Sequence, residues 1–330
     1  MIALLGATGA VGSRVLHDLR ACGLEVRAGS RTTGVDLRDR PALEEFVAGA
    51  RLVVNCAGPS HDTSAHVASV ALRAGADHVD AGGDRVRLGG PGVVAPGRVA
   101  IFAAGATPGL SGLLPRYLAR GFGEVRTLTS YSGVLDRFSP AGADDFLHGT
   151  AEAGAAWRNG RRAAHAATRT RDVELPHLSR PVVALPFLDE ENVAAAKEIS
   201  LADGTWYTFV ENGYLLAALD RVPGLDREDA VRSLCGAAAL DVAGRTPYAA
   251  LYVQIDGPAG TRTAIARAES AAEMTASVTV QAALAVLRGQ VRPGAHTAAE
   301  VLDPAVVTEL GVVVEDRPIS ELIAVEEGAL

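Results

Sequence analysis

Gly6-Ala7-Thr8-Gly9-Ala10-Val11-Gly12 is the most informative stretch of this chain, because it follows the apolar run 2–5 and opens a helical pattern. The first glycine permits a sharp turn, Gly9 lets a pyrophosphate approach the backbone, and Gly12 lets the helix pack close to the strand. Amide groups at the helix N-terminus would then face an anion. The stretch predicts a dinucleotide site, with a ligand-free βα turn as the alternative; the binding residues expected here are Gly6, Thr8, Gly9, Ala10, Val11 and Gly12.

Short apolar runs alternate with helical stretches through the first third of the chain, which is the pattern of parallel βαβ units. We expect strands at 2–5, 24–28, 34–37, 51–56, 78–79 and 99–103, and helices at 12–22, 41–50 and 61–74. These short intervals predict an α/β domain with a Rossmann-type doubly wound parallel sheet, spanning residues 1–112.

After residue 111 the pattern changes to β-rich runs with period-two alternation. Strands are expected at 124–131, 206–211, 249–256 and 261–269, the last two joined by a turn at 257–260, with helices at 113–120, 144–157 and 271–288. The basic run 158–171 is expected to be a solvated helix face or a loop. This pattern predicts a second α+β domain at 113–330, with a mixed or antiparallel sheet and a substrate or oligomerisation role. The return of the C-terminal segment of this domain to the first domain is an open alternative.

Composition excludes several classes of protein. The 330 residues carry a formal net charge of −8, so no positive excess is available for nucleic acid. The start of the chain lacks the pattern of a signal peptide, and no run of 18 apolar residues indicates a membrane span. Three cysteines without a C-x-x-C pair indicate reduced thiols in the cytoplasm. A homodimer acting on a small molecule is expected.

The choice of dinucleotide depends on the end of the second strand, where an NAD site usually has an acid. Here Ser30, Arg31 and Thr32 supply two hydroxyls and a guanidinium, a set suited to a 2′-phosphate, and the first acid is Asp36. We therefore expect NADPH or NADP, with these four residues at the site. The alternative is that Arg31 only caps a surface strand.

Two further loops follow predicted strands at the carboxyl edge of the sheet, where ligands bind. Asn55, Cys56, Ala57 and Gly58 are expected beside the cofactor ribose, with Cys56 a packing residue rather than a nucleophile. Thr107 is expected to orient the nicotinamide carboxamide, unless its loop is only a βα turn.

Hydride transfer also needs a proton donor. The candidates are Tyr131, Asp136 and His148; Tyr131 leads because its phenol is protonated at neutral pH and its ring packs on a flat ligand. The pair His78 and Asp80 is as consistent with holding a loop as with catalysis. No metal site is expected, since no cysteine or histidine set has zinc spacing.

Four stretches occur in an order that resembles the saccharopine dehydrogenase-like reductases: Gly6-x-x-Gly9-x-x-Gly12, Val53-Val54-Asn55-Cys56-Ala57-Gly58-Pro59, Ala76-Asp77-His78-Val79-Asp80-Ala81-Gly82-Gly83 and Gly105-Ala106-Thr107-Pro108-Gly109-Leu110-Ser111. Residues 130–135 are similar to the loop that begins this family's substrate domain. The resemblance implies an NADP-binding Rossmann domain, a mixed α+β domain and hydride chemistry between them.

The function implied is an NADPH-dependent reductase that transfers hydride to an imine or a conjugated C=C bond of a small or carrier-bound metabolite. A cofactor-binding regulatory or scaffold protein without turnover is the alternative. The short-chain dehydrogenase mechanism is disfavoured, because the only lysine, Lys197, has Val193 rather than tyrosine four residues before it.

Overall fold

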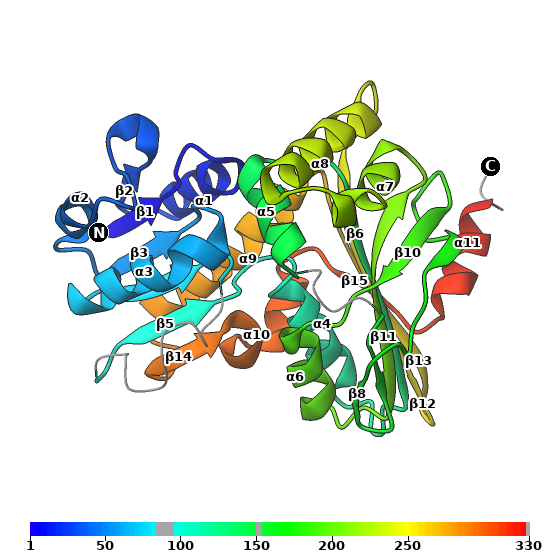
Figure 1. Ribbon diagram of the computed structural model, residues 1–330. Coiled ribbons are helices and arrows are strands. Elements are labelled where there is room, and N and C mark those ends of the chain that lie inside the picture. The colour runs from blue at the N-terminus through cyan, green and yellow to red at the C-terminus, as the bar shows by residue number, and fades with distance from the viewer. Residues whose placement is uncertain (84–95, 150–153, 328–330) are drawn as a thin grey trace. The chain divides into compact units, whose positions relative to one another are not determined.

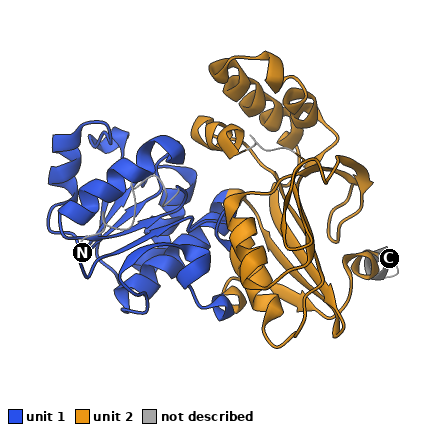
Figure 2. Cartoon of the chain, turned by 60° about the horizontal axis from the view of Figure 1, so that its bottom comes forward, with its two compact units in different colours: residues 1–110, 272–306 blue, residues 111–271, 307–330 orange. Residues whose placement is uncertain are grey.

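The computed structural model describes residues 1–83, 96–149 and 154–327 (Figure 1). The chain forms two compact units (Figure 2). Unit 1 comprises residues 1–110 and 272–306, and unit 2 comprises residues 111–271 and 307–330. The first unit therefore ends at Leu110 along the chain and is completed by a segment that returns much later. A functional division at residue 112 stays a prediction.

Within the described residues, unit 1 contains a six-stranded sheet in the order β14-β5-β4-β3-β1-β2, and all of its strand pairs are parallel. Its strands are β1 (Ile2–Leu5), β2 (Val26–Gly29), β3 (Leu52–Asn55), β4 (Asp77–Asp80), β5 (Val99–Phe102) and β14 (Gly294–Thr297). β1, β3 and β5 are buried at every position, as continuous apolar runs in a doubly covered parallel sheet should be. The predicted Rossmann-type fold is confirmed.

The helices of unit 1 are α1 (Ala10–Ala21), α2 (Arg40–Val47), α3 (Ser60–Arg73), α9 (Ala271–Leu287) and α10 (Ala298–Val301), with one 3₁₀ turn, η1 (Arg31–Thr33). α2 and α3 bury Leu43, Val47, Val67 and Val70 against Ala3, Leu5 and Val53 of the sheet. Two hydrogen bonds attach α9 to the rest of unit 1: Thr279 Oγ1 donates to Ala104 O at 2.7 Å, and Arg51 Nη2 donates to Leu287 O at 2.6 Å.

Unit 2 contains, in the part of the chain that is described, a nine-stranded sheet in the order β15-β13-β12-β6-β11-β10-β9, with β7 and β8 attached at β11. β11 runs parallel to β6 and the other pairs are antiparallel, so the sheet is mixed. Its strands are β6 (Thr127–Leu135), β7 (Ala156–Arg158), β8 (Arg161–Ala163), β9 (Thr170–Val173), β10 (Val182–Pro186), β11 (Asp203–Glu211), β12 (Tyr248–Gly257), β13 (Gly260–Ala268) and β15 (Val313–Glu315). The predicted α+β class of the second domain is confirmed.

The helices of unit 2 are α4 (Leu110–Ala119, in unit 2 from residue 111), α5 (Pro140–Gly149), α6 (Glu190–Glu198), α7 (Tyr214–Leu219), α8 (Arg227–Val242) and α11 (Ile319–Glu327), with a 3₁₀ turn at η4 (Val222–Gly224). The 3₁₀ turn η5 (Pro304–Thr308) spans the boundary between the two units. One core cluster joins α5, α7 and α8 to Val183 and Val210 of the sheet. A second cluster joins Phe209 and Tyr252 to Ile319 of α11. The expected turn at 257–260 is present, with Gly257 and Gly260 as register partners.

Four expectations about local structure were wrong. Residues 34–37 form no strand, because the chain enters η1 directly after β2 and Gly34 closes it at φ 86°. The helix expected at 144–157 ends at Gly149, and Trp157 lies in β7. Part of the basic run 158–171 pairs as β-structure in β8 and β9. The helix expected at 271–288 in the second domain is α9, which belongs to unit 1 from residue 272.

Candidate dinucleotide-binding site

The strand order of unit 1 reverses at β1. The chain passes from β1 to β2 on one side and then crosses to β3 on the other side. In open α/β sheets, ligands bind outside the carboxyl ends of the strands at such a switch point. The loops that begin at Gly6, Ser30 and Cys56 all leave this edge of the sheet.

The glycine turn has the geometry that an anion requires. Gly6 has φ 74°, and Gly9 is the N-cap of α1 without a side-chain hydrogen bond to the helix. A Cβ atom at Gly9 would lie 3.2 Å from Gly6 O and near no other atom, so the space in front of the helix N-terminus is open. Thr8, Gly9 and Ala10 are exposed. The free amide groups of α1 therefore face an accessible space.

The loop after β3 packs directly on the glycine turn. A Cβ atom at Gly6 would lie 2.7 Å from Cys56 C and from Ala57 N, and Cys56 N donates to Leu5 O at 3.0 Å. Burial raises the pKa of the Cys56 thiol far above its usual value, which agrees with a packing role. Only a residue without a side chain can occupy position 6 at this close approach.

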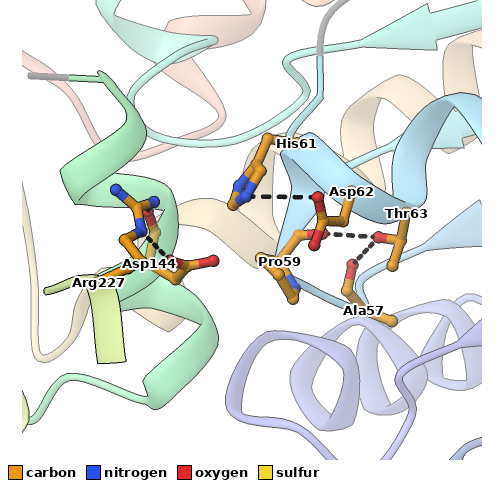
Figure 3. A network of polar contacts seen from close by, with 7 residues as sticks. All are labelled: Ala57, Pro59, His61, Asp62, Thr63, Asp144 and Arg227. Atoms are coloured by element: carbon orange, nitrogen blue, oxygen red, sulfur yellow. Dashed lines mark hydrogen bonds and ion pairs between the residues drawn. The ribbon is translucent and has the colours of Figure 1, made fainter. Parts of the chain in front are cut away.

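The first turn of α3 supports the same loop (Figure 3). Thr63 Oγ1 donates to Pro59 O at 2.9 Å and lies 3.3 Å from Ala57 O, while His61 Nε2 lies 3.6 Å from Asp62 Oδ1. Thr63 thus holds the backbone on both sides of Gly58. The other pair drawn there, Arg227 with Asp144, links α8 to α5 within unit 2.

The end of β2 forms a compact hydroxyl cluster. Ser30 N donates to Thr33 Oγ1 at 2.8 Å, and the hydroxyls of Ser30 and Thr32 are hydrogen-bonded at 2.7 Å. Ala7 N donates to Gly29 O at 3.1 Å, which ties this segment to the glycine turn. Ser30 is buried, whereas Arg31 and Thr32 are exposed.

Arg31 and Asp36 differ in their surroundings. Within the described ranges, the Arg31 guanidinium makes no recorded hydrogen bond or ion pair. Asp36 is exposed and accepts a hydrogen bond from Arg38 N at 3.0 Å in the turn beyond η1. The segment after β2 therefore presents an unengaged cation close to the glycine turn.

The ends of β3 and β4 carry a buried polar pair. Asn55 Nδ2 donates to Asp80 Oδ2 at 2.8 Å, and the two residues are 0% and 1% exposed. His78 Nε2 lies 3.4 Å from Asp80 Oδ2, and the His78 ring lies 5.5 Å from the ring of Phe102. The sequence suggested that His78 and Asp80 could hold a loop, but it did not reveal the pairing of Asp80 with Asn55.

The loop after β5 completes this edge of the sheet. Thr107 is exposed, and its loop is closed by Gly105 N donating to Pro108 O at 3.2 Å. Ala106 N lies 3.4 Å from Thr275 Oγ1 of α9. Thr275 and Thr279 were missed from sequence, because they lie about 170 residues beyond the loop that they support.

The expected proton donors all lie in unit 2. Tyr131 lies in the middle of strand β6, which continues to Leu135; the strand expected to end at residue 131 is longer, and the loop implied at 130–135 is wrong. Its ring stacks on Tyr207 at 5.2 Å between centroids, and burial, with Tyr207 beside it, raises the pKa of its phenol. Asp136 follows β6 and accepts from Arg137 N at 2.7 Å, and His148 is exposed on α5. Their catalytic roles stay predictions.

Neither a metal centre nor a membrane helix appears among the residues that the structure describes. No group of three or more His, Cys, Asp or Glu side chains there is arranged to hold a metal ion. In the same residues, no helix is long and apolar enough to cross a membrane.

Residues 2–72 match the model of the NAD dependent epimerase/dehydratase family. This segment contains the glycine turn, the end of β2 and the loop after β3. The N-terminal part of the chain is thus similar to nicotinamide-nucleotide-dependent enzymes. No curated protein matches the chain significantly.

Solved structures also resemble the chain. A putative exported protein from Burkholderia pseudomallei is 33% identical over 25% of this chain and 47% of its own, with a TM-score of 0.21. A putative myo-inositol dehydrogenase from Sinorhizobium meliloti 1021 is 12% identical over 88% of this chain and 90% of its own, with a TM-score of 0.41. A probable dehydrogenase from Thermotoga maritima is 10% identical over 79% and 74%, with a TM-score of 0.41. The fold assignment rests on the strand order and register described above.

Proposed function

We propose that this chain is an NADP(H)-dependent oxidoreductase that transfers hydride to an imine or a conjugated C=C bond of a small or carrier-bound metabolite. The observation that carries the proposal is the exposed, unengaged Arg31 guanidinium at the end of β2, in a segment hydrogen-bonded to the glycine turn. The match of residues 2–72 to a family of NAD-dependent enzymes supports a nicotinamide cofactor.

The residues after β2 favour the phosphorylated form of the cofactor. A guanidinium and a phosphate form charge-assisted, often bidentate hydrogen bonds, and the Thr32 hydroxyl adds a donor beside Arg31. Ser30, at the position where an NAD site usually has its acid, has its own hydroxyl engaged with Thr32. NADH would therefore find no carboxylate from β2 for its ribose hydroxyls.

The remaining candidate residues fit a dinucleotide laid across the switch point. The open N-terminus of α1 would hold the pyrophosphate, and the loops after β3 and β5 would contact the nicotinamide half. When bound, NADPH supplies the hydride. Tyr131 is the preferred proton donor from this chain, because a phenol is protonated at neutral pH and its ring can pack on a flat ligand.

The resemblance of four stretches to the saccharopine dehydrogenase-like reductases supports C=N or C=C reduction over other hydride chemistry. We further propose a homodimer that acts in the cytoplasm. The three cysteines are free in the structure, which is the usual state of thiols in that compartment.

Two measurements test the proposal. Fluorescence titration should show tighter binding of NADPH than of NADH, and NADPH absorbance at 340 nm should fall in the presence of 2-methyl-1-pyrroline or 2-cyclohexen-1-one. Tighter binding of NADH would contradict the cofactor assignment. Tight NADPH binding without oxidation across a broad panel of imines and enones would instead favour a regulatory protein without turnover.

A further inference from the structure

Asn55 and Asp80 occupy equivalent places on neighbouring strands. Each is the last residue of its strand, and the two are register partners in the parallel pair β3 and β4. Their side chains are hydrogen-bonded at 2.8 Å, with the Asn55 amide as donor and the Asp80 carboxylate as acceptor. The bond is buried, at the edge of the sheet where the ligand is expected.

Each side chain also fixes the turn that follows it. Asn55 Oδ1 accepts from Ala57 N at 3.1 Å, and Asp80 Oδ1 accepts from Gly82 N at 3.0 Å. This bond, from a side chain to the amide two residues onward, is the Asx turn. Two Asx turns at adjacent strand ends are therefore locked together by one buried hydrogen bond.

Backbone hydrogen bonds extend this lock to the neighbouring strands. Cys56 N donates to Leu5 O at 3.0 Å, and Ala81 N donates to Asn55 O at 3.0 Å. On the other side, Ala104 N donates to Asp80 O at 3.0 Å and Ala103 N donates to Gly82 O at 2.7 Å. A change in either turn would therefore move the loops after β1 and β5 as well.

The direction of the hydrogen bonds in the pair is specific. A carboxylate only accepts hydrogen bonds, whereas a carboxamide both donates and accepts. With one carboxylate and one carboxamide, both backbone amides and the link between the side chains are satisfied. Two carboxylates would have no donor for the link. With two carboxamides, the NH₂ group at position 80 would face either Asn55 Nδ2 or Gly82 N, and both of these are donors. Buried polar groups left unsatisfied are costly.

We propose that Asn55 and Asp80 are a positioning pair for the nicotinamide half of the dinucleotide, an inference that rests on the proposed function. The adenosine half belongs to the β1 and β2 side of the switch point, where Arg31 lies. The other half then lies over the ends of β3 and β4, whose two turns this pair sets.

The experiment separates the two halves of the cofactor. Binding of NADP⁺ and of adenosine 2′,5′-bisphosphate, which lacks the nicotinamide half, is measured by calorimetry for wild type and for Asp80→Asn. We expect Asp80→Asn to weaken NADP⁺ by about tenfold, because one buried hydrogen-bonding group loses its partner. The bisphosphate should bind both proteins equally.

A positioning role also predicts that the double variant Asn55→Asp/Asp80→Asn regains NADP⁺ binding. In this variant the amide at position 80 donates to the carboxylate at position 55, so the link between the side chains and the two bonds to Ala57 N and Gly82 N are all kept.

Asp77→Asn is the matched control, because Asp77 is on the same strand and accepts from Val99 N at 2.9 Å, but at the opposite end of β4. It should leave NADP⁺ binding unchanged. The inference is overturned if Asp80→Asn binds NADP⁺ like wild type, if it loses both ligands alike, or if the exchange variant regains nothing. If wild type binds neither ligand, the proposed function itself fails.

Discussion

A Cβ atom at position 12 would stand 2.1 Å from the carbonyl oxygen of Gly6, so the first turn of α1 rests on the backbone of the glycine turn. Gly9, between them, is less constrained, since its Cβ would make one tight contact, 3.2 Å from Gly6 O, and no clash. Of these three glycines, Gly6 and Gly12 are required by the close packing of the protein itself, and Gly9 is the one whose missing side chain leaves room for a ligand.

This difference predicts opposite behaviour of two variants. Gly12→Ala should lower the free energy of unfolding by about 1 to 3 kcal/mol, the usual cost of forcing atoms into a packed site. Gly9→Val should unfold close to wild type and lose NADPH binding, because its side chain fills the space for the pyrophosphate. Urea unfolding and fluorescence titration measure the two quantities. Micromolar NADPH affinity in Gly9→Val would mean that the cofactor binds elsewhere.

Arg31→Ala should weaken NADPH binding by about 1.5 to 3 kcal/mol, the scale of a charge-assisted hydrogen bond. NADH binding should change little, because it has no 2′-phosphate. Arg73→Ala is the control: it removes an exposed arginine whose guanidinium donates to Ser69 Oγ at 2.7 Å, at the far end of α3. An equal loss of both cofactors in Arg31→Ala would contradict the 2′-phosphate assignment.

Tyr131→Phe tests the proton donor. If the phenol protonates the substrate, kcat should fall by roughly 10²-fold, the low end for general acid catalysis, with NADPH affinity unchanged. Tyr207→Phe removes the hydroxyl of the stacked neighbour and should leave kcat near wild type. If kcat of Tyr131→Phe stays within about threefold of wild type, instead of falling roughly 10²-fold, Tyr131 is not the proton donor. Asp136, His148 or a bound water is then the next candidate.

Tyr248 should make unit 2 sensitive to alkaline pH. Its hydroxyl donates to Glu211 Oε1 at 3.0 Å, and burial followed by the Glu211 charge raises its pKa from 10.0. The unfolded chain then releases the phenolic proton first, so this stabilisation is present below pH 10.0 and is lost as pH rises further. The urea midpoint measured at pH 10.5 should therefore be lower than the midpoint measured at pH 8; the two pH values lie on either side of the ordinary tyrosine pKa of roughly 10.

The fall in the urea midpoint should be smaller in Tyr248→Phe than in wild type. Tyr214→Phe, at a tyrosine that is 61% exposed, should retain the wild-type fall. An unchanged alkaline fall in Tyr248→Phe would assign the effect to other groups, with Tyr131 the first to examine, since burial raises its pKa too.

The parts of the fold that local sequence encodes could be predicted. The spacing of the glycine turn predicts β1 and α1, and the turn residues at 257–260 between two β-rich runs indicate the hairpin of β12 and β13. α9 could be recognised as a helix but not assigned to its unit. It buries residues on most of its circumference, among them Met274, Val278 and Val286, so its sequence shows no single face that would indicate its partner.

The candidate site was predictable residue by residue but not as an assembly. Asn55 and Asp80 are separated by 25 positions, and only the register of β3 against β4 makes them partners. Tyr131 illustrates the opposite error. The resemblance implied a loop at 130–135, whereas pairing with both β11 and β12 continues the strand through this segment and makes it central in the sheet.

The late return of residues 272–306 has a consequence for synthesis of the chain. When the first 110 residues have left the ribosome, β5 still lacks β14, so one edge of the parallel sheet presents unpaired backbone groups. All of unit 2 up to residue 271 must be translated before α9 and β14 can complete unit 1, in which β14 replaces β5 as the edge strand. Unit 1 therefore cannot reach its final packing while it is the only part of the chain outside the ribosome, and its folding is completed only after β14 emerges.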